Sequence, residues 1–258
     1  MGSNRYRSKA VLIVTQGSPL SGPSSQKPLG NNSKGPKGEL PFYGRRKGRP
    51  LRPSMQALFD DTLPQIAVPP GLSDCTALFD HKPNDIVLEI GFGGGEHLAA
   101  IARKAPDTGF IGAEPFINGV ASLLRHIHED NITNIRIWPD DVRLILDDLP
   151  GACLAGAYIM FPDPWPKKRH AGRRILQKSM RDRLARLIRP GGYLRMASDH
   201  PVAKCWLLAE AMADDRFIWQ AKKADDWRRR PDGWPQTRYM AKGVEEGRPA
   251  SWFEFLRR

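Results

Sequence analysis

The chain has 258 residues, of which 40% are apolar, 9% aromatic and 26% charged, a composition that suits a globular protein and excludes collagen-like, coiled-coil and disulfide-stapled classes. The length allows one large core with attachments. A net charge of +12 favours a polyanionic partner such as a nucleic acid.

The amino-terminal part divides into two stretches. Residues 1–40 mix Ser, Gly, Pro, Asn and Lys without hydrophobic periodicity, which predicts a disordered basic extension. Its longest apolar run, at 10–14, is too short for a membrane span or a secretory signal. Residues 41–258 are predicted to form a single domain, which starts with a basic arm at 41–64 that contains a helix over 55–63.

The three cysteines, Cys75, Cys153 and Cys205, are far apart in the sequence and have no metal-ligand spacing. We therefore expect no metal site and a reducing, cytoplasmic environment.

After residue 85, short apolar runs alternate with helical patterns. The expected strands are 86–90, 110–113, 135–138, 157–161 and 193–197, and the expected helices are 98–105, 117–127, 142–149, 175–188 and 201–212. This alternation predicts an α/β fold with a doubly wound, mostly parallel sheet, and 217–219 with 251–256 could add a terminal antiparallel pair. Ligands of such sheets bind beyond the carboxyl ends of the strands.

A glycine-rich loop follows the first strand, in the run EIGFGGGE at 89–96. Gly91, Gly93 and Gly95 stand where a backbone must approach a ligand closely. Glu96 replaces the last glycine of a dinucleotide-binding fingerprint, and its carboxylate would repel a pyrophosphate at the helix start. Together with Glu89, the loop favours a cofactor with a cationic end.

Two further acids end the next strands. Glu114 closes the second strand, where a carboxylate can accept both hydroxyls of a ribose. Asp141 follows the third strand and could accept from an adenine amino group, although a helix cap explains it equally well. The set predicts a site for an adenosine that carries a positive group, such as S-adenosylmethionine.

The run FPDPWPKKRHAGRR at 161–174 follows the fourth strand. Its prolines hold Asp163 and Trp165 rigidly. Trp165 could stack on a base and Asp163 could accept from base N–H groups. The basic residues could hold phosphates, or they could simply form the charged start of a helix; they are Lys167, Lys168, Arg169, Arg173 and Arg174.

From about residue 42 onward, the sequence resembles the bacterial tRNA (guanine-N7-)-methyltransferase family. The resemblance rests on EIGFGGG at 89–95, FPDPWPKKRH at 161–170, ASDH at 197–200 and TRY at 237–239. It implies a Rossmann-like class I methyltransferase fold and methyl transfer from S-adenosylmethionine to N7 of a guanine in the variable loop of tRNA. Both a monomer and a homodimer remain open.

The resemblance also implies roles for individual residues. Contacts to the cofactor or reaction centre are expected from Glu89, Glu114, Asp141 and Asp163, and contacts to substrate from Lys167, Asp199, Thr237, Arg238, Tyr239 and Met240. Met240 stands where the family usually has Glu. The family's contact from that Glu to the guanine or the cofactor rim is therefore kept only if Glu245 or Glu246 substitutes for it. Guanine N7 has a free lone pair and no proton, so Asp163 is expected to orient the base and stabilise its developing charge.

Three other functions remain open from the residues alone. The chain could be a non-catalytic RNA-binding protein, a nicotinamide-dependent dehydrogenase, or a methyltransferase that acts on ribosomal RNA or on an exocyclic amine. Glu96 argues against the dehydrogenase. The helix residues His97, His126 and His128 are expected to be structural.

Overall fold

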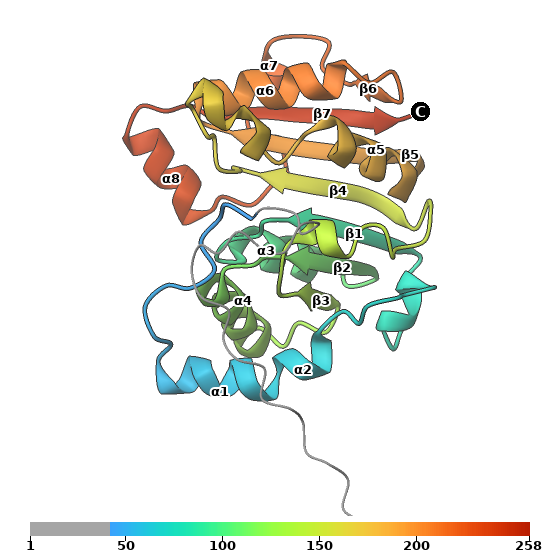
Figure 1. Ribbon diagram of the computed structural model, residues 1–258, viewed down its shortest axis with the longest axis vertical. Coiled ribbons are helices and arrows are strands. Elements are labelled where there is room, and N and C mark those ends of the chain that lie inside the picture. Colours follow the sequence, from blue (N-terminus) through green and yellow to red (C-terminus); the bar gives the residue numbers. More distant parts are fainter. Residues whose placement is uncertain (1–41) are drawn as a thin grey trace, which may run out of the picture. The chain divides into compact units, whose positions relative to one another are not determined.

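A computed structural model describes residues 42–258 (Figure 1). The predicted disordered extension at 1–40 lies outside the described residues. The chain first forms α1 (Pro53–Asp61), α2 (Leu63–Ile66) and the 3-10 turn η1 (Cys75–Leu78). Pro53 begins α1, because a fixed φ and a missing N–H are tolerated at the first helical position.

The described residues form a seven-stranded sheet with the order β3-β2-β1-β4-β5-β7-β6. Its strands are β1 (Asp85–Ile90), β2 (Thr108–Ala113), β3 (Ile135–Trp138), β4 (Leu154–Met160), β5 (Ile188–Ser198), β6 (Phe217–Trp219) and β7 (Ser251–Arg257). Strands β1 to β5 pair in parallel, and β7 pairs antiparallel with both β5 and β6. The predicted doubly wound sheet with a terminal antiparallel pair is confirmed.

Helices cover both faces of the sheet. They are α3 (Glu96–Lys104), α4 (Ile117–Glu129), α5 (Lys178–Leu187), α6 (Pro201–Met212), α7 (Asp225–Arg228) and α8 (Arg238–Glu245). Alternate residues of β1 enter opposite apolar clusters: Leu88 packs in the cluster that includes α5 and α6, and Val87 in the cluster that includes α3 and α4. Burial on both faces explains the continuous apolar runs of the parallel strands. No helix within residues 42–258 is long and apolar enough to cross a membrane.

The helix predicted over 175–188 begins later, at Lys178. Arg174 and Gln177 have extended backbones, with ψ of 138° and 168°. The Gln177 side-chain amide donates to the carbonyls of Ala171 (2.9 Å) and Arg174 (3.0 Å). These bonds fold 171–177 into a compact turn ahead of α5, which apolar spacing does not reveal.

Two other predictions differ from the structure. The helix expected over 142–149 is reduced to the 3-10 turn η2 (Val142–Leu144), because the turns that follow it bury Ile145, Leu146 and Leu149 and leave Leu144 51% exposed. The segment after Thr237, for which the sequence predicted no helix, forms helix α8. The Thr237 hydroxyl caps it by accepting from the Met240 amide at 3.3 Å.

The strand order reverses between β1 and β4. In a doubly wound sheet, the loops that leave two such neighbouring strands diverge to opposite faces and open a crevice between them. The loop after β1 carries the glycines and the loop after β4 carries Asp163, so the topology brings the two most informative sequence motifs to one edge of the sheet.

Candidate active site

A cavity of about 540 Å³ lies at the carboxyl ends of β1, β2 and β4. This volume falls in the range of small-molecule sites, roughly 300–1,000 Å³. Six segments line the cavity: the glycine loop, residues 113–116 after β2, residues 142–143 after β3, residues 161–165 after β4, residues 172–183 that lead into α5, and residues 42–45 of the basic arm. The cavity therefore joins the two motifs that the topology brings together.

Two glycines shape its floor. Gly91 has a φ of +71° and Gly93 a φ of +57°, the left-handed region that side chains disfavour. A Cβ at either position would meet no atom within 4 Å, and both residues line the cavity. The loop thus leaves room for a ligand to approach its backbone. Gly95 has another purpose, because its Cβ would lie 2.7 Å from Leu123; it lets α3 pack against α4.

Glu114 lies on the cavity wall at the end of β2. Its carboxylate is buried and accepts hydrogen bonds from the amides of Gly93 (2.8 Å) and Phe116 (2.9 Å). Burial raises the pKa of Glu114, the two backbone hydrogen bonds lower it, and the negative charge of Asp163 raises it further. The carboxylate is held in one orientation and keeps lone pairs that could accept the hydroxyls of a ribose.

Glu89 lies behind the glycine loop rather than on the open wall. It is 1% exposed, and its Oε2 atom is 2.8 Å from Nδ1 of His97. The pair joins the end of β1 to the start of α3 across the loop. His97 was expected to be structural, and here it contacts a predicted cofactor residue. The helical pattern alone could not show which way its ring points.

Asp141 caps the turn η2. Its carboxylate accepts from the Arg143 amide (3.0 Å), from Nε (3.0 Å to each oxygen) and from Nη2 (2.5 Å). Arg143 itself lines the cavity. The structure thus matches the capping interpretation that the sequence left open, while the contact to an adenine amino group stays a prediction.

Asp163 stands exposed on the cavity wall, and within residues 42–258 its carboxylate has no hydrogen-bond or ion-pair partner. The loop around it is strained: Phe161 has a φ of +50° and Trp165 a φ of +40°, which bulky residues rarely adopt. Such strain persists only where surrounding contacts hold it. The loop therefore presents a free carboxylate and an indole to the same space.

The basic arm contributes to the cavity as well. Tyr43 lines it with its ring centroid 6.4 Å from that of Trp165. The Arg173 guanidinium lies 4.3 Å from the Tyr43 centroid and 5.0 Å from the Trp165 centroid. The sequence marked this arm by its basic residues and missed its place on the cavity wall.

The start of α4 anchors the arm. Arg46 forms a 2.6 Å ion pair with Asp140, and its carbonyl accepts from the Ile117 amide at 2.9 Å. The Asn118 side chain accepts from the Gly48 amide at 2.8 Å. These bonds join residues that are 70 to 94 positions apart, and a local sequence signal cannot predict them.

The predicted substrate residues near the carboxyl terminus form a connected group. Asp199 is buried, ion-paired with Arg248, and receives a 3.4 Å hydrogen bond from the Tyr239 hydroxyl. The Tyr239 ring lies 5.3 Å from Phe161, which lines the cavity. The structure thus links α8 to the cavity through Tyr239.

The remaining predicted substrate residues lie around this group. Arg238 is the first residue of α8, and Lys167 is exposed ahead of the 3-10 turn η3 (Lys168–Arg173). Met240 is 7% exposed and packs in an apolar cluster. Glu245 and Glu246, the proposed substitutes for the missing Glu, lie at the opposite end of the helix.

Among residues 42–258, no three or more His, Cys, Asp or Glu side chains lie close enough together to hold a metal ion.

Known proteins similar to this chain include the segments that line the cavity from the glycine loop onward. A family model described as "Putative methyltransferase" matches residues 83–251. The tRNA (guanine-N(7)-)-methyltransferase of Rhodospirillum rubrum is 47% identical over 223 residues, which cover 84% of this chain and 88% of that protein. The Brucella anthropi protein of the same name is 43% identical over 220 residues, 84% and 94% of the two chains. The solved 16S rRNA methyltransferase KamB has a TM-score of 0.49 at 14% identity, covering 68% of this chain and 89% of that chain.

Proposed function

This chain belongs to the tRNA (guanine-N7-)-methyltransferase family, and from that premise we propose that it transfers a methyl group from S-adenosylmethionine to N7 of a guanine in the variable loop of tRNA. The observation that carries the proposal is a cavity with an open glycine floor and a free Asp163 carboxylate on its wall. The three free cysteines fit the reducing cytoplasm, which we propose as its compartment.

The residues of the cavity fit the proposed methyl donor. The open space beside Gly91 and Gly93 allows close approach to the backbone, and the oriented Glu114 carboxylate can accept ribose hydroxyls. The Glu114 carboxylate also lines the cavity beside a ligand that carries a sulfonium. When bound, S-adenosylmethionine supplies an electrophilic methyl group.

Asp163 is proposed to orient the guanine and to stabilise it electrostatically. N7 attacks through its own lone pair, so no proton has to be removed. The purine becomes cationic as the new bond forms, and a nearby carboxylate stabilises that charge more in the transition state than in the ground state. Within residues 42–258 the carboxylate of Asp163 forms no ion pair, although arginines line the same cavity, so it is free for this purpose.

Exposed basic side chains around the cavity are proposed to hold the tRNA backbone. The arm presents Arg45, Lys47 and Arg49, and the segment after β4 presents Lys167, Lys168 and Arg169. Cations on both sides of the cavity would contact phosphates on both sides of a nucleotide that enters it.

The proposal is tested by incubating the protein with total tRNA and labelled donor, and by mapping the modified nucleotide. We expect 7-methylguanosine in the variable loop; label at another atom or in ribosomal RNA would contradict the assignment. Asp163→Ala should keep donor affinity and lose turnover. Asp107→Ala is the matched control, because this exposed aspartate lies just before β2, at the amino ends of the parallel strands and away from the cavity at their carboxyl ends.

A further inference from the structure

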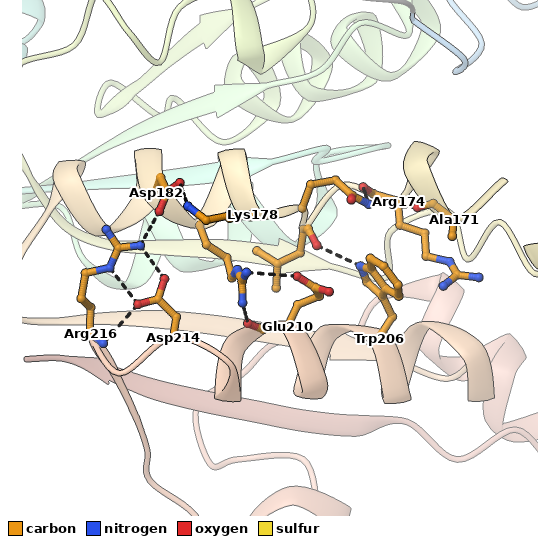
Figure 2. Close-up of polar contacts among 11 residues, drawn as sticks. Ala171, Arg174, Lys178, Asp182, Trp206, Glu210, Asp214 and Arg216 are labelled. Carbon is orange, nitrogen blue, oxygen red and sulfur yellow. Dashed lines mark hydrogen bonds and ion pairs between the residues drawn. The ribbon is translucent and has the colours of Figure 1, made fainter. Parts of the chain in front are cut away.

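Arg174 is half-buried beside the loop that carries Asp163, whereas Lys167, Lys168 and Arg169 of the same run are exposed. Its Nε and Nη2 atoms donate to the carbonyl oxygen of Trp165, at 3.3 and 3.1 Å. The face of its guanidinium lies 4.6 Å from the centroid of the Trp206 ring on α6. Figure 2 shows the Arg174 side chain reaching from its loop to Trp206.

Trp206 is itself fixed in place. Its indole N–H donates to the Leu176 carbonyl at 2.9 Å, which ties α6 to the turn ahead of α5 (Figure 2). Farther along the same interface, Arg181 of α5 bonds to the Glu210 carbonyl, and its Nη2 lies 3.5 Å from the Glu210 carboxylate. Arg174 therefore rests on a ring that the α5–α6 interface holds.

The carbonyl that Arg174 binds belongs to a strained residue. Trp165 has a φ of +40°, and its carbonyl is two residues from Asp163. A bulky residue keeps such a backbone only when neighbouring contacts over-determine it. Two donors on one carbonyl provide such a contact, so Arg174 restrains the geometry of the Asp163 loop from behind.

We propose that Arg174 is a positioning residue, which holds the Trp165 carbonyl and thereby fixes Asp163 where the target guanine is aligned. The inference rests on the proposed function of the same site. Both Arg173 and Arg174 line the cavity, but the Arg173 guanidinium stacks on Tyr43 and Trp165, whereas that of Arg174 bonds to the backbone of the loop.

A lysine cannot replace Arg174 as a positioning residue. The lysine ammonium has no planar face to stack on an indole and no rigid fork of donors. A lysine can replace an arginine in a simple phosphate contact, where the charge matters most. Experiments with Lys at this position can therefore distinguish a positioning role of Arg174 from a simple phosphate contact.

The test compares Arg174→Lys and Arg174→Gln with the wild-type protein and with Lys168→Gln, which removes a proposed phosphate contact of the same run and should lower the salt slope. The measurements are kcat and KM for tRNA methylation, and tRNA affinity over a series of salt concentrations. We expect both Arg174 variants to lose about 10- to 100-fold in kcat. The dependence of log affinity on log salt should stay at the wild-type slope in both.

A phosphate contact predicts the reverse pattern. Arg174→Lys would then keep wild-type kcat, and Arg174→Gln would lower the salt slope by roughly 0.7–0.9; either result overturns the proposal. If thermal melting shows that an Arg174 variant is unfolded, Trp206→Phe keeps an aromatic platform but removes the bond to Leu176. It should lower kcat with the salt slope unchanged, and wild-type kcat in this variant also overturns the proposal. Wild-type protein that fails to methylate tRNA contradicts the proposed function instead.

Discussion

Gly91 and Gly71 form a matched pair that tests whether the open space beside the glycine loop is ligand space. Both have a φ of +71°, and at both an added Cβ would meet no atom within 4 Å. Gly91 lines the cavity, whereas Gly71 is exposed in the turn before η1. Alanine at each position therefore changes the backbone energy equally and the cavity differently.

The effect on stability follows from the backbone. A left-handed alanine costs about 1–2 kcal/mol relative to its preferred conformation. Loss of glycine freedom in the unfolded chain returns about 0.4–1 kcal/mol. We therefore expect Gly91→Ala and Gly71→Ala each to lower the free energy of unfolding by about 1 kcal/mol, with a difference between them of no more than about 0.5 kcal/mol.

The effect on donor affinity separates the two variants. A methyl group forced into occupied space costs about 1–3 kcal/mol, and each 1.4 kcal/mol is tenfold in affinity. Gly91→Ala should therefore bind S-adenosylmethionine about 5- to 150-fold more weakly, while Gly71→Ala should bind it with wild-type affinity.

Calorimetric titration with S-adenosylmethionine measures the affinity, and urea denaturation measures the stability. Wild-type affinity in Gly91→Ala would show that the space beside the loop does not hold the donor. A large difference in stability between the two variants would refute the argument from matched backbone strain.

Three further predictions concern stability and RNA binding. His97→Ala should lower the free energy of unfolding by about 3–5 kcal/mol in urea, because it leaves the buried Glu89 carboxylate without its partner; a loss below about 1 kcal/mol contradicts the pairing. Hydrogen bonds from Lys178 and Arg216 hold the pKa of Asp182 at about 2, against 3.8 ordinarily. A carboxyl group whose pKa is lower in the folded than in the unfolded protein stabilises the fold at pH values above its unfolded pKa. This stabilisation is lost as the pH falls through its folded pKa. Asp182→Asn should therefore reduce the fall of the urea midpoint between pH 3.8 and about 2, and an unchanged pH profile would refute this. Lys47→Gln should lower the salt slope of tRNA affinity by roughly 0.7–0.9; a wild-type slope would place Lys47 on a surface that tRNA does not contact.

The sheet and the position of the cavity were predictable because both depend on short-range patterns. Buried runs such as 86–90 alternate with helical spacing, and that alternation alone favours a parallel sheet. The loops after parallel strands gather at one edge, so Gly91, Glu114 and Asp163 could be expected together before any coordinates.

The direction of individual side chains was not predictable in the same way. Arg173 and Arg174 are neighbours of one type, yet one stacks at the cavity wall and the other faces α6. His97 turns to Glu89, and residues 42–45 reach a cavity built from strands that follow much later in the chain. Each of these contacts depends on partners that lie far away in the sequence.

The reversal of strand order between β1 and β4 has an evolutionary consequence. Loops from β1 to β3 would serve the methyl donor, whereas loops from β4 onward would serve the nucleic acid. The two sets of loops come from opposite halves of the sheet, yet both line the cavity, because residues 161–183 contribute to its wall. An exchange of RNA-contacting segments with a relative would therefore have to keep residues 161–183 and replace segments from β5 onward.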